Sequence, residues 1–315
     1  MCDYLPAQNV YLVMCQLFIA NFIMLTRIGP SGLDSYRGSN VKLDKKESII
    51  MQGCKSITPL CDAHVHLTDP EFSAYLKEIL ASIRTMKMHV CSVTVDIAST
   101  INGIKTFGQS NNDIVTQFIG IHPQFVQEVD IEKFVEIFSE YSDSIGGIGE
   151  IGLDPTYTLN KGNSYEKQKQ VFHEMLGLAE KSNKPISIHS RKSLDDILDI
   201  IGSYNLTNLL FHWFSGNKKQ LRVLMDRGAY VSYGPPLVFS EDKRVLLKNT
   251  DRNRILIETD GPVQYPRCFA KLPALPTSFL VTVAKSVGEV LDISYLEATE
   301  FITSNTENFL GKKLW

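Results

Sequence analysis

Short apolar runs rich in valine and isoleucine alternate with longer amphipathic segments along most of the chain. Between the runs, apolar positions recur at helical spacing, as in Tyr165–Lys181. This alternation is typical of parallel strands with helices outside them. It predicts an α/β fold, a (β/α)8 TIM-type barrel over residues 57–315. The eight predicted strands are Cys61–Leu67, Val90–Ala98, Gln117–Ile121, Ile145–Leu153, Pro185–Ser190, Asn208–Trp213, Tyr230–Tyr233 and Ile255–Thr259.

An open, doubly wound sheet is the alternative fold for the same alternation. The polar residues favour the barrel, because each candidate functional side chain lies on a predicted strand or at its carboxyl end. In a barrel these ends meet at one mouth, whereas an open sheet would spread them along a crevice. The length of 315 residues fits one barrel of roughly 250 residues with an appendage.

Residues 1–56 precede the barrel pattern and are predicted to form a non-barrel N-terminal extension. The apolar stretch Tyr11–Leu25 is interrupted by Gln16 and Asn21 and has no basic start, so it resembles neither a membrane span nor a secretory signal. Two interpretations stay open. The extension is an accessory helix or an arm that binds a protein partner, or it is a non-native segment upstream of a start at Met51.

Composition narrows the class of protein. A hydrophobic content of 43% and a charged content of 21% are typical of a globular protein, not a disordered one. The net charge of -3 excludes a generic basic coat for nucleic acid, so a phosphate substrate would need a local site. The cysteines contain no Cys-x-x-Cys pair, which argues against a zinc ribbon and for free thiols in a reducing cytosol. They are Cys2, Cys15, Cys54, Cys61, Cys91 and Cys268. With the poor membrane span at Tyr11–Leu25, we expect a cytoplasmic protein without stable membrane association.

Two histidines lie one residue apart at the end of the first predicted strand, in Asp62-Ala63-His64-Val65-His66. Residues i and i+2 of a strand point to the same face, so both imidazoles can bind one cation. Asp62 shares that face and is predicted to orient a ligand from the second layer around the metal. Taken alone, the pair could also be two half-exposed polar positions.

A single glutamate interrupts the fourth predicted strand. Glu150 lies in Gly149-Glu150-Ile151-Gly152-Leu153-Asp154, and a carboxylate buried there without compensation would be costly. We therefore expect a cation beside Glu150, and its two oxygens suit a bridge between two metals. Asp154 belongs to the same site or caps the following loop.

The fifth and sixth predicted strands each end in a histidine. His189 is followed by Arg191, whose planar guanidinium suits phosphate unless it pairs with a carboxylate. His212 is followed by Trp213 and Phe214, which could stack a nucleobase or simply pack at the rim.

Three further candidates follow the third and eighth strands. Asp260 could bind a metal and accept a proton from the attacking water. Glu258 shares the face of Asp260 by strand alternation, or it orients a neighbouring ligand or pairs with a basic residue. His122 is predicted to be a substrate contact or an extra ligand, with a plain structural role as the alternative. His89 and His173 are expected away from the mouth, at the bottom of a strand and on an outer helix.

Seven motifs, taken in order, resemble those of the TatD-like metal-dependent nucleases, a branch of the amidohydrolase-like barrels. The resemblance covers Ile57 to Leu310. It implies one or two divalent ions, with His64, His66, Glu150 and Asp260 around one and Glu150, His189 and His212 around the other. The motifs are Asp62-Ala63-His64-Val65-His66, Gly120-Ile121-His122-Pro123, Gly149-Glu150-Ile151-Gly152-Leu153-Asp154, His189-Ser190-Arg191, His212-Trp213-Phe214-Ser215-Gly216, Glu258-Thr259-Asp260-Gly261-Pro262 and Asn305-Thr306-Glu307-Asn308-Phe309.

The resemblance also implies hydrolysis of DNA phosphodiesters, often from single-stranded or 3′ ends, with zinc, magnesium or manganese. Asp260 and Glu150 would be catalytic, and His122 and Arg191 would contact the substrate. The loop Tyr265–Pro276 departs from the Arg-Gly and Asn-Glu-Pro pattern of many members. An ester or amide hydrolase, such as an aminoacyl-tRNA deacylase or lactonase, is the second hypothesis. An inactive, partner-binding barrel is the third.

Overall fold

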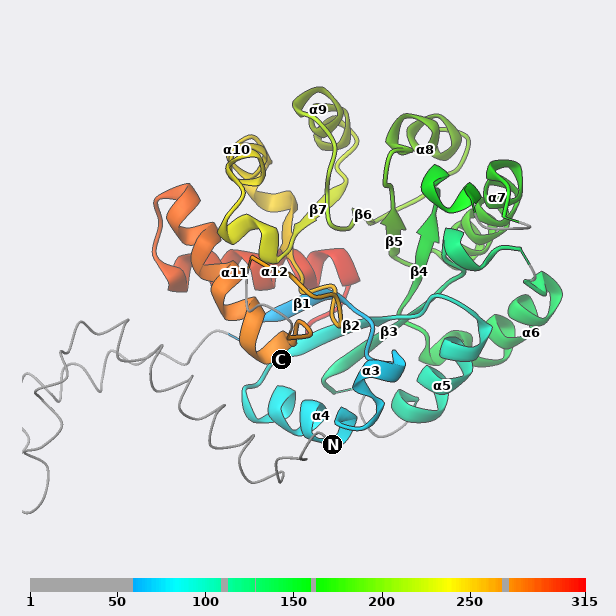
Figure 1. The fold of residues 1–315 in the computed structure, drawn as a ribbon, viewed down its shortest axis with the longest axis horizontal. Coiled ribbons are helices and arrows are strands. Elements are labelled where there is room, and N and C mark those ends of the chain that lie inside the picture. Colours follow the sequence, from blue (N-terminus) through cyan, green and yellow to red (C-terminus); the bar gives the residue numbers. More distant parts are fainter. Residues whose placement is uncertain (1–58, 109–112, 128, 160–162, 268–271) are drawn as a thin grey trace, which may run out of the picture. The chain divides into compact units, whose positions relative to one another are not determined.

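The fold is a parallel barrel of eight strands surrounded by helices (Figure 1). A computed structural model describes residues 59–108, 113–127, 129–159, 163–267 and 272–315. Each strand pairs in parallel with the next one along the chain, from β1 to β8. The strands are β1 (Cys61–Val65), β2 (His89–Val93), β3 (Val115–Ile119), β4 (Gly147–Gly152), β5 (Ile186–His189), β6 (Leu209–Phe211), β7 (Tyr230–Tyr233) and β8 (Ile255–Ile257).

Helices occupy every connection between consecutive strands. The α-helices are α3 (Pro70–Ser73), α4 (Leu76–Thr85), α5 (Ile97–Phe107), α6 (Ile131–Tyr141), α7 (Tyr165–Ser182), α8 (Leu194–Ile201), α9 (Lys218–Asp226), α10 (Glu241–Lys248), α11 (Pro276–Leu291) and α12 (Tyr295–Leu310). Short 3-10 helices span Pro123–Phe125, Ser142–Ser144, Pro155–Leu159, Pro235–Val238 and Arg252–Arg254. None of the helices in the described ranges is long and apolar enough to cross a membrane.

The eight predicted strands are all present, and most of them end earlier than predicted. The interpretation of Val90–Ala98 as one strand is wrong at its end, because Ile97 begins α5. Asp96 caps this helix by accepting a hydrogen bond from the Ser99 N–H at 2.7 Å, which stops the extended backbone. The predicted helix Tyr165–Lys181 is confirmed as α7, extended by one residue.

The predictions for residues 1–56, including the stretch Tyr11–Leu25 and a start at Met51, lie outside the described residues. So do Cys2, Cys15, Cys54 and Cys268. Cys61 and Cys91 are free and buried, as predicted. Burial raises the pKa of the Cys91 thiol to about 12, so this thiol stays protonated and unreactive.

Apolar side chains fill the lower part of the barrel. Phe309 from α12 packs against Phe118 and Tyr230, with ring centroids 5.9 and 5.5 Å apart. Ala63 and Leu256 belong to the same buried cluster. The candidate ligands lie beyond this cluster, at or after the carboxyl ends of their strands.

Residues beside the candidate ligands close the barrel between β1 and β8. The Asp260 N–H donates to the His64 carbonyl at 2.9 Å, and the His66 N–H donates to the Gly261 carbonyl at 2.8 Å. Asp62 accepts hydrogen bonds from the N–H and hydroxyl of Thr259 at 3.0 and 2.6 Å. These bonds join the first strand to the last, so the open-sheet alternative is wrong.

Asp62→Ala should lower the free energy of unfolding by about 3 kcal/mol, because it leaves buried donors at the seam without an acceptor. Urea denaturation followed by circular dichroism measures the change. Asp199→Ala, an exposed position on α8, is the matched control and should have almost no effect. Equal losses in the two variants would show that Asp62 does not hold the seam.

Candidate metal centre

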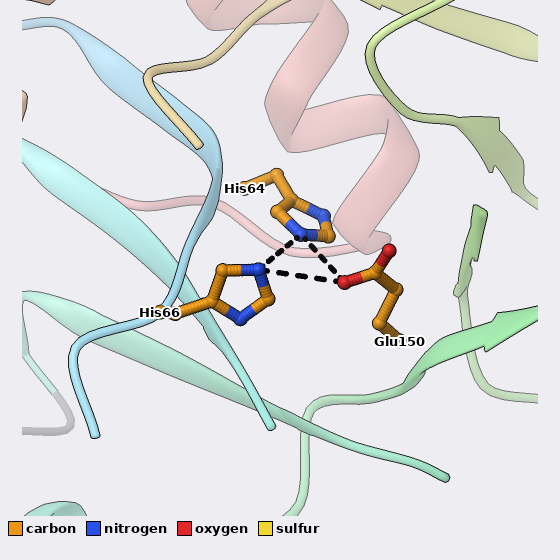
Figure 2. A group of neighbouring side chains, drawn as sticks. All are labelled: His64, His66 and Glu150. Carbon is orange, nitrogen blue, oxygen red and sulfur yellow. Dashed lines mark hydrogen bonds and ion pairs between the residues drawn. The ribbon is translucent and has the colours of Figure 1, made fainter. Parts of the chain in front are cut away.

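Glu150 lies at the centre of the barrel mouth with histidines on both sides. Its Oε1 is 2.8 Å from His189 Nδ1 and 2.8 Å from His212 Nε2. Its Oε2 is 3.3 Å from His64 Nε2 and 3.4 Å from His66 Nε2. Figure 2 shows the two rings from β1 and its end converging on this carboxylate. The isolated glutamate of the sequence is thus buried among imidazoles that come from distant parts of the chain.

Asp260 joins the group of donors near Glu150 Oε2, which contains His64 and His66. Its Oδ1 lies 3.3 Å from His66 Nε2 and 3.8 Å from His64 Nε2. Because β8 ends at Ile257, Asp260 is in the turn that follows, with a left-handed φ of 52°. The donors near Oε2 are those of the first ligand set that the resemblance implied, whereas Oε1 has His122 at 3.5 Å in addition to His189 and His212.

The outer nitrogens of two rings are held by acceptors. His66 Nδ1 donates to the Val93 carbonyl at 3.0 Å, and His189 Nε2 donates to Asp154 Oδ2 at 2.9 Å. In the neutral rings the other nitrogen then carries a lone pair that faces the centre, as a metal ligand requires. Asp154 also accepts from the Thr156 N–H at 2.8 Å, so it both orients a histidine and caps the loop.

His122 has the opposite arrangement. Its Nδ1 accepts a hydrogen bond from the Gln124 N–H at 3.2 Å, so the hydrogen of the neutral ring lies on Nε2. That nitrogen is 3.5 Å from Glu150 Oε1 and 3.3 Å from His189 Nδ1. Burial lowers the pKa of His122 to about 3, so the ring is neutral near pH 7. His122 therefore presents a donor to the centre, and the substrate-contact interpretation fits it better than that of an extra ligand.

The charges of the centre fit a bound cation. Glu150 and Asp260 are buried, and within the described ranges neither carboxylate pairs with lysine or arginine. Burial alone would raise the pKa of Glu150, but His212 and His122 hold it well below its usual range. Burial would lower the pKa of His212, but Glu150 raises it well above its usual value. Protons on imidazoles are thus the available compensation, and a divalent ion supplies the same charge.

Glu258 follows the last residue of β8 and contacts Ser232 and His212. Its Oε2 accepts a hydrogen bond from Ser232 at 2.5 Å, and its Oε1 is 3.8 Å from His212 Nδ1. Strand alternation does not place it beside Asp260, because the strand has already ended. The second interpretation, in which Glu258 orients a neighbouring ligand, fits these contacts.

Three residues near the centre were not anticipated. Ser187 on β5 contacts His64 Nδ1 at 2.9 Å, and Ser232 on β7 contacts Glu258. A single small polar residue inside an apolar strand was the signal for both. Tyr157 is half-buried, and its ring centroid lies 5.5 Å from that of His122. An aromatic residue in the loop after a predicted ligand strand is a weaker signal.

The remaining predicted residues lie at the rim, in the core or away from the mouth. Arg191 is exposed after β5, and in the described part of the chain it forms no ion pair. Phe214 is 1% exposed and packs in the core, whereas Trp213 is half-buried. His89 begins β2 at the opposite end of the barrel, and His173 is exposed on α7. Both lie away from the centre, as predicted.

A parallel barrel with imidazoles and carboxylates at its mouth is the architecture of metal-dependent hydrolases. Residues 61–311 match the family described as TatD related DNase, and the chain therefore belongs to the TatD family of metal-dependent hydrolases. It is 25% identical to human deoxyribonuclease TATDN3 over 80% of this chain and 95% of that protein. It is 28% identical to the Bacillus subtilis metal-dependent hydrolase YabD, over 79% and 97%.

Solved structures share the fold. The TatD homologue YJJV from Escherichia coli superposes with a TM-score of 0.72 at 19% identity, over 81% of this chain and 98% of that one. A TatD family hydrolase from Entamoeba histolytica gives 0.70 at 19% identity, over 81% and 99%. The resemblance found in the motifs and the predicted barrel are confirmed.

Protein purified without chelator should contain divalent metal, measured by inductively coupled plasma mass spectrometry on untagged protein. Glu150→Ala should lose most of it, because both sides of the centre share this carboxylate. His189→Ala should lose the metal of one side only. His173→Ala, an exposed histidine on α7, should keep the full content. Unchanged metal in Glu150→Ala would contradict the assignment.

Proposed function

We propose that this chain is a metal-dependent deoxyribonuclease that hydrolyses phosphodiester bonds. The observation that carries the proposal is the shared carboxylate of Glu150, with two groups of donors on its two oxygens. A pair of cations a few ångströms apart is a common device for in-line displacement at phosphorus. The name of the human relative, a deoxyribonuclease, supports DNA as the substrate.

The donor set decides which residues would hold metal. By the contacts to Glu150 and the family resemblance, His64, His66, Glu150 and Asp260 would hold one ion, and Glu150, His189 and His212 the other. Mixed imidazole and carboxylate donors suit zinc, and manganese or magnesium are the alternatives for phosphoryl chemistry. When bound, such ions lower the pKa of water and offset the negative charge of the phosphate.

Three side chains of the protein then act on the substrate. A carboxylate oxygen of Asp260 accepts a proton from the attacking water, since its Oδ1 lies at the candidate centre, 3.3 Å from His66 Nε2. The Nε2–H of His122 donates to a phosphate oxygen as charge builds up there. The exposed Arg191 guanidinium binds a neighbouring phosphate group from the rim.

The finer features of the proposal come from the sequence and the family resemblance. They are exonucleolytic cleavage, a preference for single-stranded or 3′ ends, and a cytoplasmic location. Residues 1–56 would be a separate extension that contacts a protein partner, with residues 57–315 forming the hydrolase barrel.

Hydrolysis of a carboxylic ester or amide, including an aminoacyl ester on transfer RNA, is the second candidate function. The same activated water attacks a carbonyl carbon. Arg191 favours a phosphate ester over a carboxylic ester as the substrate. Within the described residues no carboxylate neutralises its charge, and it follows His189, the last residue of β5, by two positions. An inactive barrel is disfavoured, since such barrels have no reason to keep every candidate ligand in place.

Asp260→Asn should lower kcat for a 3′-ended oligonucleotide at least about 100-fold, because the amide cannot accept the proton. The fold should persist, as the backbone bond from Asp260 N to His64 O is kept. Gel analysis of the oligonucleotide, run beside a simple lactone and an aminoacyl ester under the same metal loading, measures the loss. Faster hydrolysis of the lactone or aminoacyl ester by the wild type would support the second function instead.

His122→Phe should lower kcat/KM about 100-fold, because it removes the donor that faces the phosphate. His122→Gln keeps an N–H donor and should recover part of the rate. Metal content should stay unchanged in both variants, which separates a substrate contact from a ligand. A loss of metal in His122→Phe would show that this histidine binds the ion.

A further inference from the structure

Trp213 directly follows His212, the candidate ligand at the end of β6. Consecutive Cα atoms lie about 3.8 Å apart, so the indole begins one residue from the metal centre. Its backbone is fixed: the Trp213 N–H donates to Ser232 Oγ at 3.3 Å, and that hydroxyl donates to Glu258. The side chain thus starts from a point that is tied to the same network as the ligands.

The indole is held on one side and partly exposed on the other. Its ring centroid lies 5.4 Å from that of Tyr265, with the planes at 45°. Tyr265 is itself 4% exposed and donates its hydroxyl to the Thr259 carbonyl at 3.0 Å, so it forms a rigid support. Trp213 is half-buried, so part of the indole is open to solvent at the end of β6 (Leu209–Phe211). A large aromatic face is therefore presented next to the centre.

Trp213 packs against the small buried cluster of Tyr265, Ala274 and Phe279, but its side chain stays partly exposed. The next residue, Phe214, is 1% exposed and already fills the core at the end of β6. Trp213 has a left-handed φ of 41°, a backbone conformation that is unfavourable for a bulky side chain. Such strain is concentrated at functional sites, where the surrounding structure maintains it. In the described part of the chain the indole N–H has no hydrogen-bond partner, so its edge remains available as well.

We propose that Trp213 is a stacking platform for a nucleobase, namely the base of the nucleotide whose phosphate lies at the metal centre. This proposal rests on the proposed function and names its substrate class more closely. Every base has a π face, so the platform accepts all four bases without reading the sequence. It distinguishes a nucleotide ester from a lactone or a phosphodiester that has no base. The stacking free energy of one base on an aromatic side chain corresponds to roughly 10- to 100-fold in affinity. This is the loss of affinity that we expect when the indole is removed.

The chain offers a direct optical test, because it contains two tryptophans. Trp315 is 53% exposed and lies beside His89, at the opposite end of the barrel. Trp315→Phe therefore leaves Trp213 as the single indole fluorophore. In that background with Asp260→Asn to prevent turnover, titration with a tetrathymidylate should quench the fluorescence. A tetramer of the same length with an abasic 3′-terminal nucleotide should bind roughly 10- to 100-fold more weakly and quench less.

Substitutions of Trp213 provide the second readout. Trp213→Leu should raise KM for the tetrathymidylate roughly 10- to 100-fold and leave KM for the abasic tetramer unchanged, while Trp213→Phe should keep part of the stacking. Equal quenching by both tetramers, or an unchanged KM in Trp213→Leu, would overturn the platform and leave the nuclease intact. Quenching that is specific for the base, in a wild type that cleaves no oligonucleotide, would support the platform and refute the nuclease.

Discussion

Glu150 is 3% exposed in the middle of an apolar strand, and an ionised carboxylate in that place needs compensating charge. Five imidazoles approach its two oxygens, and they come from the ends of β1, β3, β5 and β6. Only a closed parallel barrel brings those four ends around one point. The requirement to compensate a single buried carboxylate therefore links the architecture of the whole barrel to its chemistry.

The residues that close the barrel also carry candidate ligands, so the stability of the fold and the geometry of the centre depend on the same segments. The seam between β1 and β8 is closed by backbone bonds at His64, His66 and Asp260, all of which carry candidate ligand side chains. Asp62 supports this seam from below, and burial raises its pKa to about 8 against the opposing hydrogen bonds from Thr259. A change in how the strands close would move the donors relative to one another, so the geometry of the centre is fixed by the fold and not by a flexible loop.

Periodicity and isolated polar residues were sufficient to predict the barrel and the residues at its mouth, because both signals come from side chains. The ends of the strands were harder to predict from the sequence, since they depend on caps such as Asp96 and on turns such as the one at Asp260. Strand alternation did not place Glu258 beside Asp260, because β8 ends before both residues, at Ile257. The hydrogen positions of the histidines could not be predicted at all, because backbone groups such as the Val93 carbonyl and the Gln124 N–H determine them.

The centre by itself does not select between phosphorus and carbon as the atom that water attacks, since ligands of this kind activate water for either. Selection must therefore come from groups that contact the parts of the substrate that do not react. Arg191 and Trp213 are placed for that role, each one or two residues beyond a candidate histidine ligand in a loop after β5 or β6. Loops at the carboxyl ends of barrel strands can change without disturbing the core. In the roles proposed for them, a cation and an aromatic face at these two positions would bias a general hydrolytic centre toward nucleotides.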